Sequence, residues 1–145
     1  MRKSCDNLVI ETRRVGNSVI LVARKGGRRV GGASFWLADA ECARRDYEDM
    51  REKNVLAEDG RIALLRTLTV TWMARRTGIG ARLVGLASRL ARKAGASTLY
   101  VHAVDIEGGN PLSFYLSCGF AVVHRNSDSN HYMKKLLVRA SRARD

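Results

Sequence analysis

Apolar and polar residues alternate along the first part of the chain, and glycine-containing turns interrupt the alternation. The pattern predicts strands over residues 8–12, 18–24 and 29–38. Gly16 and Asn17 form the first interruption, and the Gly26–Gly27 pair in the second is typical of a two-residue hairpin turn. We therefore expect three short strands that follow one another through tight turns.

A charged segment follows at residues 40–54, where the few apolar residues stand at helical spacing. Ala43, Tyr47 and Met50 would form one narrow stripe, so the pattern predicts a single helix with little buried surface. Such a helix can be a solvated surface element or an element that faces a substrate, and the sequence leaves both alternatives open.

The clearest pattern is a strand, a helix and a strand between residues 61 and 104. Residues 61–71 predict a fourth strand, in which alternation places Leu64, Leu68 and Val70 on one face together with Arg66. Apolar residues recur every three or four positions over 79–94, which predicts an amphipathic helix ended by Gly95. Residues 98–104 predict a fifth strand, parallel to the fourth because a helix connects them.

The last part of the chain predicts a short helix and a final hairpin. Pro111 suits the first turn of a helix that runs to about residue 118, with Asn110 as its cap. Strands are predicted over 120–125 and 131–138, and the basic tail 139–145 is expected to fray. With 145 residues and 46% apolar content, the chain predicts a single α/β domain over 1–145.

The junction between the fourth strand and the long helix carries the features of a phosphate site. Gly78 and Gly80 allow a tight turn, and the helix N-terminus behind them carries partial positive charge. Arg75 and Arg76 add full charges with fork-shaped donors. The spacing excludes a P-loop, and a dinucleotide fingerprint would need glycine where Leu83 stands. The remaining alternative is that the glycines only cap or pack the helix.

This junction resembles the acetyl-coenzyme A signature of the GNAT superfamily of N-acetyltransferases, a strand ending L-x-V followed by [RQ]-x-x-G-x-[GA] and a long helix. The matching residues are Leu68, Val70, Arg75, Gly78 and Gly80, while Trp72 replaces the usual proline of the connector. The resemblance implies acetyl-coenzyme A as acetyl donor, and we expect no metal site. It implies that the Val70 backbone bonds the pantetheine arm and that the helix start holds the pyrophosphate. The full set of implied cofactor-binding residues is Leu68, Val70, Arg75, Arg76, Thr77, Gly78, Ile79, Gly80, Ala81, Asn110 and Tyr115.

A second segment, 110–120, resembles the other GNAT signature. Tyr115 stands four residues before Gly119, as the family's tyrosine does, whereas Asn110 lies two residues nearer the tyrosine than usual. The resemblance implies a mixed, twisted sheet of about six or seven strands with helices on both faces, splayed between the fourth and fifth strands. The family usually places helices between the first and second strands, but here the helical segment comes between the third and fourth.

Acetyl transfer to an amine needs a group that protonates the departing thiolate and a group that accepts a proton from the amine. Tyr115 is the candidate acid, and its alternative role is an aromatic that fills the helix–sheet contact. The predicted fourth strand contains no carboxylate, so the base is sought among His102, Asp105 and Glu107. We favour His102, although a lone strand histidine is more often a packed or surface residue, and a water chain is an alternative.

The formal net charge of +12 is unevenly distributed along the chain. Residues 39–59 contain eight of the fourteen acidic residues and four bases, which gives a local charge of −4 and leaves +16 elsewhere. The acidic segment favours a cationic acceptor, either a small amine or the lysine or N-terminal amine of a peptide. The basic remainder favours a nucleic-acid-linked amine, such as an aminoacyl-tRNA or a base. An inert coenzyme A-binding module is the third alternative.

Three scattered cysteines show no disulfide or zinc spacing, which favours a reduced, cytoplasmic protein. No apolar run has the length of a membrane span, and the first residues lack the apolar core of a signal peptide. We expect a cytoplasmic monomer or homodimer that does not bind membranes.

Overall fold

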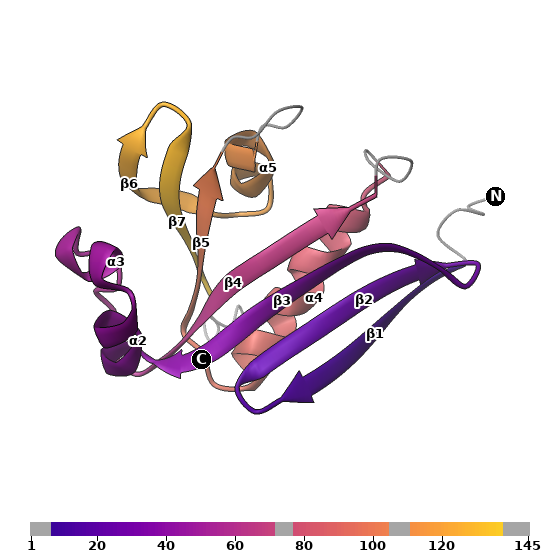
Figure 1. Ribbon diagram of the computed structural model, residues 1–145, viewed down its shortest axis with the longest axis horizontal. Helices are drawn as coiled ribbons and strands as arrows, with labels where there is room; N and C mark the ends of the chain where they lie inside the picture. The colour runs from indigo at the N-terminus through magenta and orange to yellow at the C-terminus, as the bar shows by residue number, and fades with distance from the viewer. Residues whose placement is uncertain (1–6, 72–76, 105–110, 138–145) are drawn as a thin grey trace, which may run out of the picture.

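The computed structural model describes residues 7–71, 77–104 and 111–137 of the chain. Its strands form one mixed sheet in the order β1-β2-β3-β4-β5-β7-β6 (Figure 1). Their bounds are β1 Leu8–Val15, β2 Ser18–Lys25, β3 Arg28–Asp39, β4 Arg61–Val70, β5 Thr98–Val104, β6 Ala121–Ser127 and β7 Asn130–Leu136. This arrangement confirms the predicted fold class.

The first four strands pair antiparallel in sequence order. Gly26 and Gly27, between β2 and β3, have φ values of 60° and 85°. A turn with both central residues at positive φ matches the right-handed twist of the flanking strands and favours glycine at both positions. The predicted hairpin is therefore confirmed, and the strands extend beyond their predicted ends.

A bulge in β4 contradicts the predicted alternation of that strand. Phe35 of β3 lies opposite Leu65, but its neighbour Ser34 lies opposite Thr67, so Arg66 is an extra residue without a partner in β3. The bulge reverses which face the following side chains occupy. Leu64 therefore packs on one side of the sheet, whereas Leu68 and Val70 pack on the other, and the prediction that the three share a face was wrong.

Helices cover both faces of the sheet, and each face has its own apolar core. The long helix α4 (Ile79–Lys93) and the short helix α5 (Pro111–Ser117) pack on one face, with Leu83, Val84, Ala87 and Ala91 of α4 fully buried (Figure 1). Gly95, at φ 97°, follows the end of α4 as predicted. Burial of Leu83 and Val84 contributes about 1.5–3 kcal/mol each, so α4 is a principal source of stability.

The predicted single helix over 40–54 is wrong, because two short helices occupy the segment. These are α2 (Ala40–Asp46) and α3 (Glu48–Glu52), separated by Tyr47 at φ −118° and ψ 77°. Tertiary contacts compensate for the lost helical turn, since α3 bonds β6 and β7 through Asp49 and Lys53. Ala43 and Met50 are buried as predicted, in the second core.

The turn of the final hairpin is shorter than predicted, because both strands continue further into it. β6 continues to Ser127 and β7 begins at Asn130, so two residues connect them. β7 inserts between β5 and β6 and pairs antiparallel with both. In the described part of the chain, no helix has the length and apolar content needed to cross a membrane.

Candidate functional site

The strands β4 and β5 pair over only three residues before they separate. Ala63, Leu64 and Leu65 lie opposite Leu99, Tyr100 and Val101. β4 then continues to Val70 on the side of β3, while β5 continues to Val104 on the side of β7. The predicted splay between the fourth and fifth strands is therefore present, and it opens a gap in the sheet between the two faces.

The N-terminus of α4 lies at the open end of this gap. Gly78, at φ 85°, precedes the first residue of α4, and no side chain of the described residues caps the first turn. The first turn also contains no acidic residue. Backbone N–H groups there can bind an anion, and the helix dipole favours the negative charge.

Gly78 and Gly80 are required for different reasons. A Cβ on Gly78 would have no atom within 4 Å, so its left-handed φ rather than crowding favours glycine there. A Cβ on Gly80 would lie 3.2 Å from Cζ of Phe114 and 3.6 Å from Cγ2 of Val70. Gly80 thus allows α4 to approach both α5 and the end of β4, which brings the two sequence signatures into contact.

Tyr115 lies on the α4 side of the sheet, 7% exposed in the first core. Its ring makes edge contacts with Phe114 and Phe120, at centroid distances of 5.2 and 5.3 Å. Burial raises the pKa of Tyr115 to about 12. The phenol is therefore protonated at neutral pH, as a proton donor must be.

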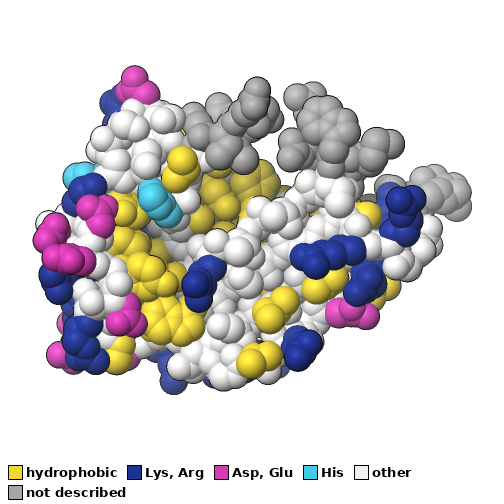
Figure 2. Space-filling model, in the orientation of Figure 1, with side chains coloured by type: hydrophobic (Ala, Val, Ile, Leu, Met, Phe, Trp, Pro, Cys, Tyr) yellow, Lys and Arg dark blue, Asp and Glu magenta, His cyan; other side chains and the backbone are white. Residues whose placement is uncertain are grey.

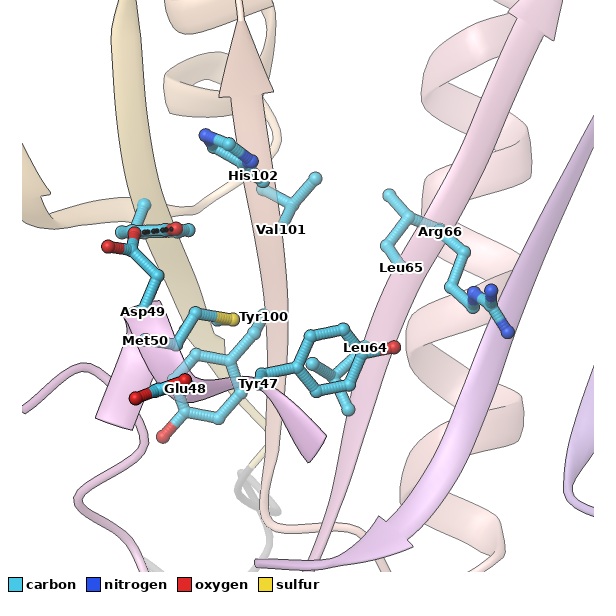
Figure 3. A pocket seen from close by; sticks show the side chains of 11 residues that line it. Tyr47, Glu48, Asp49, Met50, Leu64, Leu65, Arg66, Tyr100, Val101 and His102 are labelled. Atoms are coloured by element: carbon cyan, nitrogen blue, oxygen red, sulfur yellow. Dashed lines mark hydrogen bonds between the residues drawn. The ribbon is translucent and has the colours of Figure 1, made fainter. Parts of the chain in front are cut away.

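A pocket of about 460 Å³ lies on the opposite face, where the strands part. Its floor comes from β4 and β5, and α3 with Tyr47 forms one wall (Figure 3). The space-filling view shows an apolar floor there, with acidic side chains gathered over α2 and α3 (Figure 2). The lining residues that carry polar chemistry are Tyr47, Glu48, Asp49, Arg66, His102 and Tyr132. The Arg66 guanidinium extends away from the other labelled groups toward β3 (Figure 3).

Asp49 is held in a hydrogen-bonded network at the edge of this pocket. Its Oδ2 accepts from the Tyr132 hydroxyl at 2.5 Å and from Lys53 Nζ at 3.1 Å. The Tyr132 bond, followed by Lys53, lowers the pKa of Asp49 below its ordinary value. The pKa of Tyr132 rises to about 12, first through desolvation and then through Asp49. Asp49 is therefore a fixed negative charge beside the pocket.

His102 has a defined partner on β7. Its Nε2 lies 2.6 Å from Oδ1 of Asn130, and the same oxygen accepts from Nδ2 of Asn126 at 2.8 Å. Because this oxygen is an acceptor, Nε2 carries the hydrogen and Nδ1 has a lone pair in the neutral ring. The ring also packs against Tyr132 at a centroid distance of 4.5 Å. The arrangement fixes both the orientation and the tautomer of His102.

The structure places most of the predicted site residues around the splay. Leu68, Val70 and 77–81 lie at its open end, Tyr115 lies on the α4 face and His102 lines the pocket on the other face. Arg75, Arg76, Asn110, Asp105 and Glu107 lie outside the described residues. Sequence reasoning missed Asn130 and Tyr132, which β5–β7 pairing brings to His102. Tyr132 belonged to the predicted strand 131–138 and Asn130 to the polar turn before it, and neither pattern specifies a partner strand.

A model of the "Acetyltransferase (GNAT) family" matches residues 3–120 of the sequence. The chain belongs to the GNAT acetyltransferase family. It is an acetyl-coenzyme A-dependent N-acetyltransferase, as predicted. No curated protein matches the sequence.

Several solved structures share the fold of this chain at low sequence identity. PaiA N-acetyltransferase from Thermoplasma acidophilum, in complex with coenzyme A, is 18% identical with a TM-score of 0.61, over 83% of this chain and 61% of that one. Aminoglycoside 6'-N-acetyltransferase complexed with coenzyme A is 17% identical with a TM-score of 0.62, over 86% and 75%. Nourseothricin acetyltransferase is 16% identical with a TM-score of 0.60, over 91% and 85%.

The described residues fit the acetyl donor of this family. Coenzyme A carries phosphates, and the start of α4 offers uncapped amides next to Gly78 without a nearby acid in the first turn. The donor supplies an acetyl group activated as a thioester. The pocket on the other face is lined by residues of β4 and β5 at the point where these two strands separate.

Proposed function

We propose that this acetyltransferase modifies a cationic primary amine that enters the pocket between α3 and the parted strands. The observation that carries the proposal is the position of Glu48 and Asp49 at a pocket whose floor is the splay. A protonated amine is attracted to these carboxylates before it loses its proton. The acceptor is a small amine, or the lysine or N-terminal amine of a peptide.

Two similar structures are named as acetyltransferases of an aminoglycoside and of nourseothricin. These names support a small-molecule acceptor here. The pocket volume of about 460 Å³ also lies in the range of small-molecule sites.

The proposed donor site combines the start of α4 with the end of β4. Backbone amides of Thr77, Gly78, Ile79, Gly80 and Ala81 hold the pyrophosphate, and the Leu68–Val70 end of β4 faces the pantetheine arm. In this proposal Arg75, Arg76 and Asn110 contribute from outside the described residues. The uncapped helix start and the left-handed Gly78 support this site.

The proposed proton transfers use one residue on each face of the sheet. The protonated amine first loses one proton to solvent, and His102 Nδ1 accepts the second proton as the amine nitrogen attacks, while Asn130 keeps the other ring nitrogen protonated. The amine nitrogen forms a bond to the carbonyl carbon and the carbon–sulfur bond breaks. Tyr115 then donates its proton to the departing sulfur, and solvent restores the hydroxyl.

The test is steady-state kinetics on a panel of mono- and dicationic amines and short lysine peptides. The Glu48→Gln/Asp49→Asn variant removes two negative charges from the pocket, and we expect the acceptor KM to rise about tenfold, or 1.4 kcal/mol. The affinity for acetyl-coenzyme A should not change. The control is Glu11→Gln/Asp128→Asn, which removes the same charge from ion pairs on β1 and beyond β6. An unchanged acceptor KM in the pocket variant contradicts the proposal.

A further inference from the structure

A second groove lies on the α4 face, at the end of the helix far from the proposed donor site. It has a volume of about 330 Å³ and runs between β1 and the C-terminal half of α4. Thr12, Arg14, Val19, Leu90 and Lys93 are among its lining residues. The groove exists because α4 packs on β2 to β5, while the edge strand β1 continues beside the helix without being covered.

The charge of this groove and its rim is positive. α4 carries Arg82, Arg89, Arg92 and Lys93 but no acidic residue. Arg89 and Lys93 are one helical turn apart, about 6 Å along the axis, on the exposed side of the helix. Arg14 stands across the groove and donates from Nε to the carbonyl of Gly16 at 3.0 Å. Among the described residues, no Asp or Glu forms an ion pair with Arg14, Arg89 or Lys93.

We propose that this groove binds the phosphate backbone of a double-stranded nucleic acid. The planar guanidinium of arginine matches the geometry of phosphate oxygens. A row of cations without nearby acids also binds the nucleic acid more tightly, because binding releases the counterions condensed on its phosphates. The lining contains no aromatic side chain on which the bases of a single strand could stack. The polar side chains that line it are Thr12, Arg13, Arg14 and Lys93, and cationic groups of this kind bind phosphate oxygens whatever the base sequence.

The groove and the donor site are well separated. α4 has fifteen residues, so its two ends lie about 22 Å apart. The groove also lies on the opposite face of the sheet from the acceptor pocket. A bound nucleic acid therefore leaves both reaction sites open, and it serves to place the enzyme beside proteins or amines carried on that nucleic acid.

The test is fluorescence anisotropy with RNA and DNA duplexes of about 20 base pairs, at salt concentrations from 50 to 200 mM. The variant Arg14→Gln/Arg89→Gln/Lys93→Gln removes three charges from the groove. Its control, Arg28→Gln/Arg45→Gln/Arg125→Gln, removes the same charge from exposed positions on β3, α2 and β6. We expect the groove variant to lose at least about tenfold in affinity and its salt slope to fall by about 2 to 3, whereas the control changes little.

Acetyl-coenzyme A binding shows whether a loss of duplex binding reflects the groove or a failure to fold. Both variants should bind acetyl-coenzyme A like the wild-type protein, which shows that they are folded. If the triple variant does not fold, Arg89→Gln alone should still reduce the salt slope by about 1. Absence of duplex binding at 50 mM salt overturns the proposal. Equal losses in the groove and control variants also overturn it, as does stronger binding of polyglutamate than of either duplex.

Discussion

The two faces of the sheet differ in both helix and charge. The α4 face carries a fifteen-residue helix with four bases and no acid, whereas the opposite face carries two short helices from the acidic segment 39–59. Both faces reach the same gap, where β4 and β5 part after Leu65 and Val101. The difference indicates how one gap can receive an anionic donor from one side and a cationic acceptor from the other. We therefore expect substitutions in the donor site to change coenzyme A affinity and substitutions in the pocket carboxylates to change the acceptor KM.

The largest effect is expected from Tyr115→Phe, which removes the proposed acid and keeps the ring. Because general acid catalysis contributes about 10²–10⁴-fold, kcat should fall at least about 100-fold, with little change in the affinity for acetyl-coenzyme A. Stopped-flow measurement of single turnovers checks this. The matched control is Tyr47→Phe, at the half-buried tyrosine of the acceptor pocket. Full activity of Tyr115→Phe would reduce Tyr115 to a packing role.

The pH dependence of kcat gives a second check on Tyr115. Burial raises its pKa to about 12, so the acid stays protonated and active until the pH approaches that value. Ionisation of Tyr115 should therefore cause no loss of kcat up to about pH 10. A Tyr115-dependent loss between pH 7 and 9 would show that the hydroxyl ionises more easily than its burial implies.

A smaller effect, confined to the donor, is expected from Gly80→Leu. The new side chain would press on the Phe114 ring, which lies within 3.3 Å of the added Cβ, and coenzyme A affinity should fall by about 1–3 kcal/mol. Arg75→Ala/Arg76→Ala should have an effect of similar size through lost phosphate contacts. Calorimetry measures both. Gly85→Ala is the control on the same helix, because its Cβ would approach only the Arg89 side chain, at 3.8 Å. Unchanged affinity would mean that the donor site lies elsewhere.

On the acceptor face, Asn130→Asp should change the pH profile more than the maximal rate. A carboxylate next to His102 Nε2 stabilises the protonated ring, so proton transfer from the amine needs higher pH in the variant. The acidic limb of kcat/KM should move up by about 1 pH unit or more. Asn17→Asp, in the β1–β2 turn, is the control. If the limb is the same in His102→Gln and in the wild-type protein, another group accepts the proton.

The smallest effect is expected from Tyr132→Phe, which removes the main bond to Asp49. The pKa of Asp49 should rise toward its ordinary value, with Lys53 still in contact. Because the folded-state pKa of Asp49 is depressed, its bonds stabilise the fold above the unfolded-state pKa and lose this effect as the pH falls through the folded value. Carboxyl titration by NMR measures the change, and thermal unfolding at pH 3 and pH 7 measures the consequence. An unshifted Asp49 would mean that Lys53 alone holds the carboxylate.

Local patterns were sufficient for most of the secondary structure and for the donor end of the site. The apolar residues at helical spacing in α4 and the apolar run of β5 predicted the ends of both elements to within about one residue. Gly78 indicates a constrained turn because its left-handed φ is a local property of the chain, whereas the need for Gly80 comes from the packing of Phe114 and Val70. The register of β4 could not be predicted, because the bulge at Arg66 depends on the pairing with Phe35 and Ser34 of β3.

The sequence by itself determined the family, the fold class and the strand–helix junction, since these depend on periodicity and on glycines whose effect extends over a few residues. The tertiary structure decided the break at Tyr47, which turns Asp49 toward Tyr132, and the pairing of β5 with β7, which brings Asn130 to His102. It also decided that β4 and β5 separate after three pairs. These features depend on contacts between residues far apart in the chain, and such contacts leave no local pattern.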